Sequence, residues 1–193
     1  DGDYLFEPVA GLIDYYSYWE YIPEAIVIGV NQAGFRKEDG LINPESELPV
    51  ETGALFYDFI TLEVLEFAAK NYRTLPFWVI TAQDFMANYA SFFLMKDNPE
   101  FRGYINLSPD YSPQTIDRLK AVFESTDQKL WYYMSTAEND ISQLRESIRT
   151  ANAQFKNLEN DNFFFYYNDF KKEDHHSHAG LGLSFAFQDI FSP

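Results

Sequence analysis

Five short apolar runs, separated by longer segments with helical spacing, constrain the fold of this chain more than any other feature. The runs are residues 25–30 (AIVIGV), 77–81 (FWVIT), 103–107 (GYINL), 129–134 (KLWYYM) and 162–167 (NFFFYY). Each run is too short for a good helix and lacks the strict alternation of a half-exposed strand. Continuous apolar runs of this length are typical of strands that are covered on both faces.

The segments between the runs have the spacing of amphipathic helices. In residues 55–71 the apolar side chains fall on one stripe, made of Phe56, Phe59, Ile60, Val64, Leu65 and Ala68. Residues 85–95, 113–124 and 141–157 are predicted as further helices, and Ser112 before Pro113 is typical of a helix start. Alternating strands and helices predict a single α/β domain over residues 1–193, with a doubly wound, mostly parallel sheet and helices on both faces.

Composition excludes several classes of function. Acidic residues outnumber basic ones 30 to 14, for a net charge of −16, so phosphate backbones and anionic lipids would repel the chain. We therefore predict no nucleic-acid partner. The absence of cysteine excludes disulfides, thiolate metal sites and cysteine nucleophiles. No apolar run reaches the roughly 18 residues that a membrane-spanning helix needs.

Two segments follow the carboxyl ends of predicted strands, where parallel α/β sheets bind their ligands. Residues 31–52 form a long polar connection after the run at 25–30, and such connections are usually functional or mobile. Residues 82–86 (AQDFM) follow the run at 77–81 directly. We expect a site near these two segments, although the long connection is equally explained as a surface excursion.

Several segments, in the same order along the chain, resemble the esterase branch of the α/β-hydrolases, which includes ferric-siderophore (enterochelin-type) esterases. The segments are AIVIGVNQAGFRKEDG, TGALFYDFITLEVLEFAAKNYRTLPF, NPEFRGYINLSPDY and KEDHHSHAGLGLSFAFQDIF, and the resemblance covers nearly the whole chain. It implies an α/β-hydrolase-like fold, and it makes Arg36 and Asp39 candidate ligand-binding residues. The habits of the family also suggest a periplasmic or secreted location.

The first residues, Asp1-Gly2-Asp3, resemble the end of an earlier strand in that family. In the family's sheet this strand lies between the strands that correspond to residues 25–30 and 77–81. The resemblance therefore implies an N-terminally incomplete domain. A sheet without a middle strand leaves backbone groups unpaired, so we expect the strand to come from a longer parent protein or from a partner chain.

The nucleophile turn of the family is Gly-x-Ser-x-Gly, and here it reads Ala82-Gln83-Asp84-Phe85-Met86. Acyl transfer needs a hydroxyl that a histidine can deprotonate, and the glycines let strand and helix approach closely. Asp84 takes the place of the serine, while Ala82 and Met86 replace the glycines. The resemblance thus implies a vestigial catalytic site. A hydrolase with Asp84 as nucleophile and an esterase with a relocated serine are the alternatives, although Ser91 and Ser108 are poorly placed for that role.

The family's catalytic triad also contains a histidine and an acid, and residues of both types are present at the corresponding positions of this sequence. His175 matches the family's histidine, and Glu138 or Asp140 could supply the acid, although either acid equally suits a helix start. Tyr111 would line the same cleft as a ligand-binding residue. Zinc bound by the three histidines of the HHSH sequence, residues 175–178, would need a fourth ligand, such as Asp174 or Glu173. We predict no metal and no cofactor.

We therefore predict an esterase-like domain without hydrolytic activity, which binds a protein partner or a small molecule. Residues 14–23 (DYYSYWEYIP) carry five aromatic side chains, which suit a protein interface because they offer large contact area at low entropic cost. The same rings could instead cover the core from the first helix.

Overall fold

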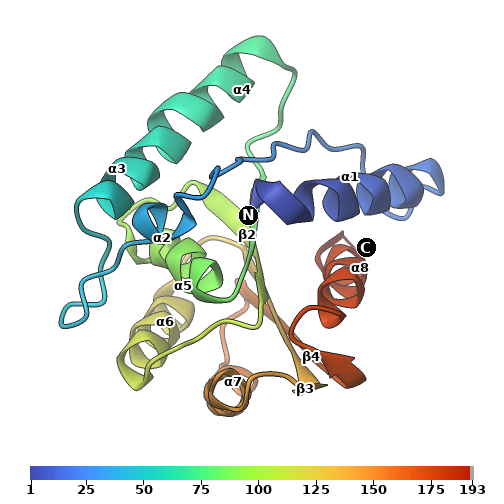
Figure 1. Cartoon of the computed structure of the whole chain (residues 1–193). Helices are drawn as coiled ribbons and strands as arrows, with labels where there is room; N and C mark the ends of the chain where they lie inside the picture. The colour runs from blue at the N-terminus through green and yellow to red at the C-terminus, as the bar shows by residue number, and fades with distance from the viewer. Residues whose placement is uncertain (192–193) are drawn as a thin grey trace.

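A computed structural model of the protein describes residues 1–191 and contains a parallel sheet of four strands (Figure 1). The strands are β1 (Trp78–Gln83), β2 (Phe101–Leu107), β3 (Leu130–Asn139) and β4 (Phe163–Asp174), and they lie in the order β1-β2-β3-β4. The predicted fold class is confirmed, and four of the five apolar runs are strands.

Helices cover both faces of the sheet, as the alternation in the sequence predicts. Helices α1 (Gly2–Tyr18) and α8 (His178–Phe191) lie on one face, and α5 (Phe85–Phe92), α6 (Pro113–Ser125) and α7 (Ser142–Phe155) lie on the other (Figure 1). The predicted helix at 55–71 is one continuous helical segment made of α3 (Thr52–Asp58), the π-helix η1 (Phe59–Val64) and α4 (Leu65–Asn71). A 3₁₀ turn, η2 (Phe93–Met95), follows α5.

The core has two halves, one on each side of the sheet. Tyr104 of β2 faces the half that α5, α6 and α7 cover, and its neighbour Ile105 faces the half that α1 and α8 cover. In β3, Tyr132 and Tyr133 divide in the same way. The central strands are therefore apolar at consecutive positions because both faces are buried.

Residues 25–30 form no strand within the described residues, so the fifth predicted strand is wrong for this structure. Their backbone is extended, but Ile26 and Ile28 are exposed, because no neighbouring strand completes a ladder. The first two residues of the chain lie between this segment and the end of β1. Gln83 N–H donates to Asp1 Oδ2 over 2.8 Å, and Gly2 N–H donates to the Val30 carbonyl over 2.9 Å.

The long connection from residue 31 to 52 is ordered around a short helix, α2 (Arg36–Asp39), and an isolated bridge between Ile42 and Pro49. The helix places the Arg36 side chain at the carboxyl end of β1. Within residues 1–191, no helix has both the length and the apolar character needed to cross a membrane.

Candidate functional site

The joint between β1 and α5 is a strained turn at Asp84. Asp84 has φ 60° and ψ −138°, a conformation that is costly for any residue except glycine. Its N–H donates to the Leu107 carbonyl over 2.9 Å, and its own carbonyl accepts from Ala87 N–H over 2.9 Å. The sharp strand-to-helix turn is therefore present although neither Ala82 nor Met86 is a glycine.

The bulk of Met86 fits beside this turn because Gly40 makes room for it. Met86 is buried, and a Cβ on Gly40 would lie 2.6 Å from the Met86 sulfur and 2.8 Å from the Phe85 ring. Gly40 caps α2, so the connection from 31 to 52 packs directly on the start of α5. A glycine in another segment therefore provides the space that the Met86 side chain occupies.

Arg36 lies over the turn and faces the Asp84 carboxylate. Arg36 Nη1 is 3.6 Å from Asp84 Oδ2, and Nη2 donates to the Gln83 carbonyl over 2.7 Å. Its Nε donates to Asp1 Oδ1 over 2.6 Å, and its guanidinium stacks on the Phe85 ring at 4.2 Å. The side chain of Asp84 remains 32% exposed, so the charge at this turn is paired but not enclosed.

His175 and Asp140 form a close pair at the carboxyl ends of β3 and β4. His175 Nδ1 is 2.9 Å from Asp140 Oδ1, and their side chains are 13% and 0% exposed. This hydrogen bond raises the pKa of His175 against the opposing effect of burial. Burial opposes ionisation of Asp140, but hydrogen bonds from His175, Ser108, Thr136 and the Ile141 N–H outweigh it and hold the Asp140 pKa below its usual range.

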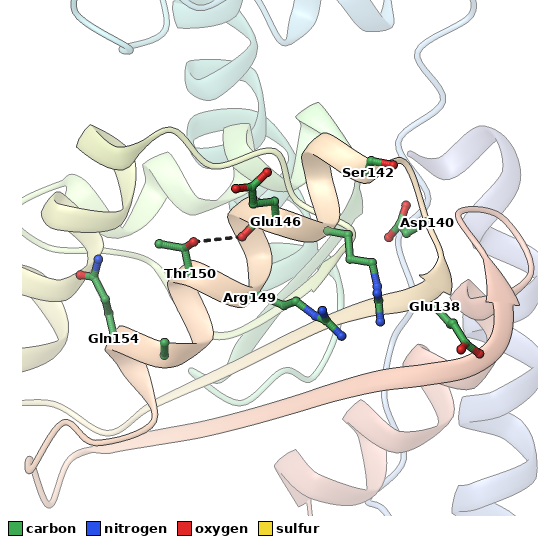
Figure 2. Close-up of a pocket in the computed structure, with 9 residues that line it drawn as sticks. Glu138, Asp140, Ser142, Glu146, Arg149, Thr150 and Gln154 are labelled. Atoms are coloured by element: carbon green, nitrogen blue, oxygen red, sulfur yellow. Dashed lines mark hydrogen bonds between the residues drawn. The ribbon is translucent and has the colours of Figure 1, made fainter.

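The two acids that sequence reasoning could not separate have different places. Asp140 points inward to His175, whereas Glu138 is exposed and accepts from the Lys172 N–H over 3.0 Å. Figure 2 shows both at the end of a shallow groove beside α7. The two arginines of that groove, Arg145 and Arg149, both pair with Asp169, so this groove is a solvated ion-pair cluster.

Asp84 and His175 lie on the same edge of the sheet but are not directly joined. No hydrogen bond or ion pair connects them in the part of the chain that the structure describes. The Gln83 side-chain amide donates to the His175 carbonyl over 2.6 Å, which ties the histidine loop to the turn. The negative charge of Asp84 adds to the rise in the His175 pKa, after the larger effect of Asp140.

The two remaining predicted ligand-binding residues make no hydrogen bond or ion pair with Asp84 or His175 among residues 1–191. Asp39 accepts from the Gln32 side-chain amide over 3.1 Å. Tyr111 is buried, its hydroxyl bonds those of Ser91 and Tyr132, and burial raises its pKa well above the usual value. Tyr111 therefore offers no polar atom to an open cleft at Asp84.

Sequence reasoning missed the role of Ser108 and His178. Both are fully buried, Ser108 Oγ donates to Asp140 Oδ2 over 2.5 Å, and His178 Nε2 lies 3.2 Å from the same hydroxyl. The only signal was that Ser108 follows the carboxyl end of β2. Within residues 1–191, no group of three metal-ligating side chains has the geometry of a metal site.

Neither a family model nor a curated protein matches the sequence. Solved structures do match. An uncharacterised protein from Capnocytophaga ochracea DSM 7271 is 21% identical with a TM-score of 0.88, over 100% of this chain and 55% of that chain. An IroE-like serine hydrolase from Shewanella oneidensis is 22% identical with a TM-score of 0.82, over 99% of this chain and 68% of that chain. The siderophore hydrolase EstB from Aspergillus nidulans is 14% identical with a TM-score of 0.76, over 100% of this chain and 80% of that chain.

At these identities the likeness establishes the fold and leaves the activity open. This chain spans about half of the first of these proteins and two thirds of the second. The parallel sheet, the helices on both faces and the similar structures agree with the sequence resemblance. The chain has a parallel α/β fold similar to that of these esterase-like hydrolase structures.

Proposed function

We propose that this chain is an esterase-like domain that binds rather than hydrolyses. The observation that carries the proposal is the residue at the strained turn. Asp84 has no hydroxyl, and its carboxylate faces the Arg36 guanidinium at 3.6 Å. A carboxylate is a weak attacker of an ester carbonyl because it is a weaker base than the alkoxide that must leave. The facing cation reduces its nucleophilicity further.

Neither Ser91 nor Ser108, the two serines considered as replacements, meets the requirements of a nucleophile. Ser108 is fully buried and contacts His178 rather than His175. Ser91 is also fully buried and bonds the hydroxyls of Tyr111 and Tyr132. A nucleophile has to meet substrate, so neither hydroxyl supports the relocated-serine alternative.

The aromatic end of α1 supports a role in protein binding. Tyr15, Tyr18, Trp19 and Tyr21 are all exposed, and Tyr18 and Trp19 pack edge to face at 5.2 Å. Figure 1 shows this end of α1 running out past α8. Exposed clusters of Tyr and Trp are typical of protein interfaces, and residues 1–24 contain six acids and no base, which suits a basic partner surface.

The proposal is tested by assaying the purified chain on short-chain aryl esters beside the Asp84→Ala and Asp84→Ser variants. We expect the wild-type chain and Asp84→Ala to give the same background rate. Turnover by the wild-type chain that Asp84→Ala abolishes would overturn the proposal. Activity gained only in Asp84→Ser would support it, since that result shows a working histidine and acid beside a lost nucleophile.

A second candidate function is hydrolysis with Asp84 as the nucleophile, and the backbone strain at Asp84 favours it. Strain of this kind persists where a side chain must be presented at a sharp turn. An Asp84 oxygen would attack the carbon of an alkyl halide, which releases halide and forms an ester. Water, deprotonated by His175, would then attack the Asp84 carbonyl carbon, release the alcohol and restore the carboxylate.

This second function predicts an isotopic signature that binding alone cannot give. During turnover of an alkyl halide in H₂¹⁸O, one water oxygen enters the Asp84 carboxylate, and peptide mass spectrometry measures the gain. His175→Gln should trap the ester intermediate on Asp84. A chain that gains neither label nor adduct under these conditions has no Asp84 nucleophile.

A further inference from the structure

A continuous chain of hydrogen-bonding groups runs behind the His175–Asp140 pair. It begins at His175 Nδ1, 2.9 Å from Asp140 Oδ1, and continues from Asp140 Oδ2 to the Ser108 hydroxyl over 2.5 Å. The Ser108 hydroxyl is 3.2 Å from His178 Nε2, and His178 Nδ1 is 3.0 Å from the Asp174 carbonyl. These hydrogen-bonding groups thus connect His175, which is nearly enclosed, to His178, which is fully buried.

When His178 is neutral, this series of hydrogen-bonding groups has too few protons to make a hydrogen bond at every contact. The Asp174 carbonyl can only accept, so His178 Nδ1 carries a proton and a neutral His178 has a bare Nε2. The Ser108 hydroxyl then faces two acceptors, Asp140 and His178, with one proton to give. When His178 is protonated, its Nε2–H donates to Ser108, and the Ser108 proton is free for Asp140. Only this second arrangement satisfies every contact.

The surroundings of His178 act on its protonation in opposite directions. Burial lowers the His178 pKa, and the Asp174 carbonyl and the Asp140 charge oppose this effect. The titratable or charged groups that face it are Asp140, which follows β3, Asp174 at the end of β4, and His175 from the turn before α8. The Phe170 ring of β4 lies 6.3 Å away and offers no charge.

The backbone holds the Ser108 hydroxyl in place between the two acceptors. Ser108 has a positive φ of 47°, and its N–H donates to the Ser135 carbonyl over 2.9 Å. Its partner Asp140 is also held by the Thr136 hydroxyl and the Ile141 N–H, each at 2.8 Å. With both side chains anchored, the element that is free to change is the direction of the Ser108 O–H bond.

We propose that His178 is a positioning residue for the His175–Asp140 pair and acts through the Ser108 hydroxyl. Protonated His178 directs the Ser108 proton to Asp140, and neutral His178 draws it away. A carboxylate with an additional donor holds the His175 proton less strongly. The charge of His175 therefore responds to the state of a residue that is fully buried, whether the corner at Asp84 binds or cleaves.

Titration of the ligand-free chain, followed by NMR of its histidine rings, tests this relay. In the wild-type chain the His175 ring signal should show its own step and a second, smaller step at the pH where His178 titrates. A direct charge effect of His178 on His175 would also produce a second step, so variants are needed to separate the two. Ser108→Ala removes the relay and leaves the direct charge effect, and it should shrink the second step at least twofold.

His178→Gln supplies an amide N–H that can donate to Ser108 at every pH. The second step should vanish, and the His175 transition should lie at lower pH than in Ser108→Ala, because Ser108 then always donates to Asp140. The matched control is His176→Gln, whose ring centroid is 5.0 Å from that of His175 and which lies outside the chain of contacts. This control should leave the second step unchanged.

The spectra of amides far from the site report whether each variant is folded. If Ser108→Ala does not fold, Ser108→Gly suits the backbone φ of 47° and reports the same step. A single-step His175 curve in the wild-type chain, across the range where it stays folded, overturns the proposal. A second step of the same size in the Ser108 variant overturns it as well.

Discussion

Two carboxylates at the same edge of the sheet, Asp140 and Asp84, are held in different ways. The Asp140 side chain is fully buried and accepts hydrogen bonds from His175, Ser108, Thr136 and the Ile141 N–H. The Asp84 side chain is 32% exposed and meets one cation at 3.6 Å. The fold therefore depends on the Asp140 carboxylate, whereas little of it depends on the Asp84 carboxylate.

This difference bears on our proposal, in which Asp84 stands at the nucleophile position of an esterase-like domain. The backbone turn at Asp84 is fixed by Leu107 and Ala87 through main-chain hydrogen bonds, in which the Asp84 side chain takes no part. A substitution at this position changes the chemistry without removing a buried contact. The acid and the histidine, in contrast, are part of a buried polar network, and removing either leaves unpaired groups.

The largest expected effect belongs to Asp140→Ala. It leaves a buried imidazole and two hydroxyls without their common acceptor, so we expect the free energy of unfolding to fall by about 3–5 kcal/mol. Asp84→Ala should lower it by less than about 1 kcal/mol, since it removes one partly exposed ion pair. Urea denaturation measures both. The control Glu138→Ala, at an exposed acid of the same strand, should stay within about 0.5 kcal/mol. Equal losses at Asp140 and Asp84 would remove the contrast.

The second prediction concerns the pH dependence of stability. The pKa of Asp140 is lowered in the folded chain, so its stabilisation is present above its ordinary value of about 3.9 and is lost as the pH falls through the folded value. His178, also lowered, adds a loss that begins below its ordinary value of about 6.5. His175 is raised, so its contribution is complete below about 6.5 and is lost as the pH rises through the folded value.

Urea titrations at a series of pH values, at fixed ionic strength, measure these three losses. The His175→Gln variant should lack the loss on the alkaline side and keep the loss on the acid side. If the alkaline loss persists unchanged in this variant, the His175–Asp140 pair is not its source.

Much of the fold follows from local pattern, but strand pairing does not. Consecutive buried residues such as Tyr104 and Ile105 predict strands covered on both faces, and β2 is such a strand. Residues 25–30 have an equally apolar pattern and form no strand. The pattern indicates burial, whereas a β-strand also needs an adjacent strand with which to form backbone hydrogen bonds. That neighbour cannot be read from the six residues themselves.

The candidate site is likewise only partly predictable from the sequence, because some of its contacts join residues that are far apart along the chain. Asp84 and His175 were picked out because family positions are tied to sequence order. Asp140 and Glu138 could not be separated, since one follows β3 directly and the other is among its last residues, and only packing against the turn before α8 distinguishes them. Ser108 and His178 are 70 residues apart, and nothing local to either one predicts their contact.

The Asp84→Gly variant tests whether the backbone turn at this position is strained. Glycine relieves the cost of φ 60° and ψ −138°, which is about 1–3 kcal/mol, although it adds freedom to the unfolded chain. We expect a net gain of about 1 kcal/mol in the free energy of unfolding, measured by urea denaturation. Asp84→Ala is the matched control, since it also loses the carboxylate but keeps the Cβ. If both variants have the same stability, the turn stores no strain.

The smallest effect is expected for the ion pair between Asp84 and Arg36. Arg36 also holds Asp1 and the Gln83 carbonyl, so the single variant Arg36→Gln overstates the pair. A double-mutant cycle with Asp84→Asn isolates it, and we expect a coupling free energy of about 0.2–1 kcal/mol, because both side chains are partly exposed. A coupling above about 2 kcal/mol would mean that this corner is held as firmly as the buried network. Asp84 would then be a structural residue, and its carboxylate would be unavailable to a ligand as well as to a substrate.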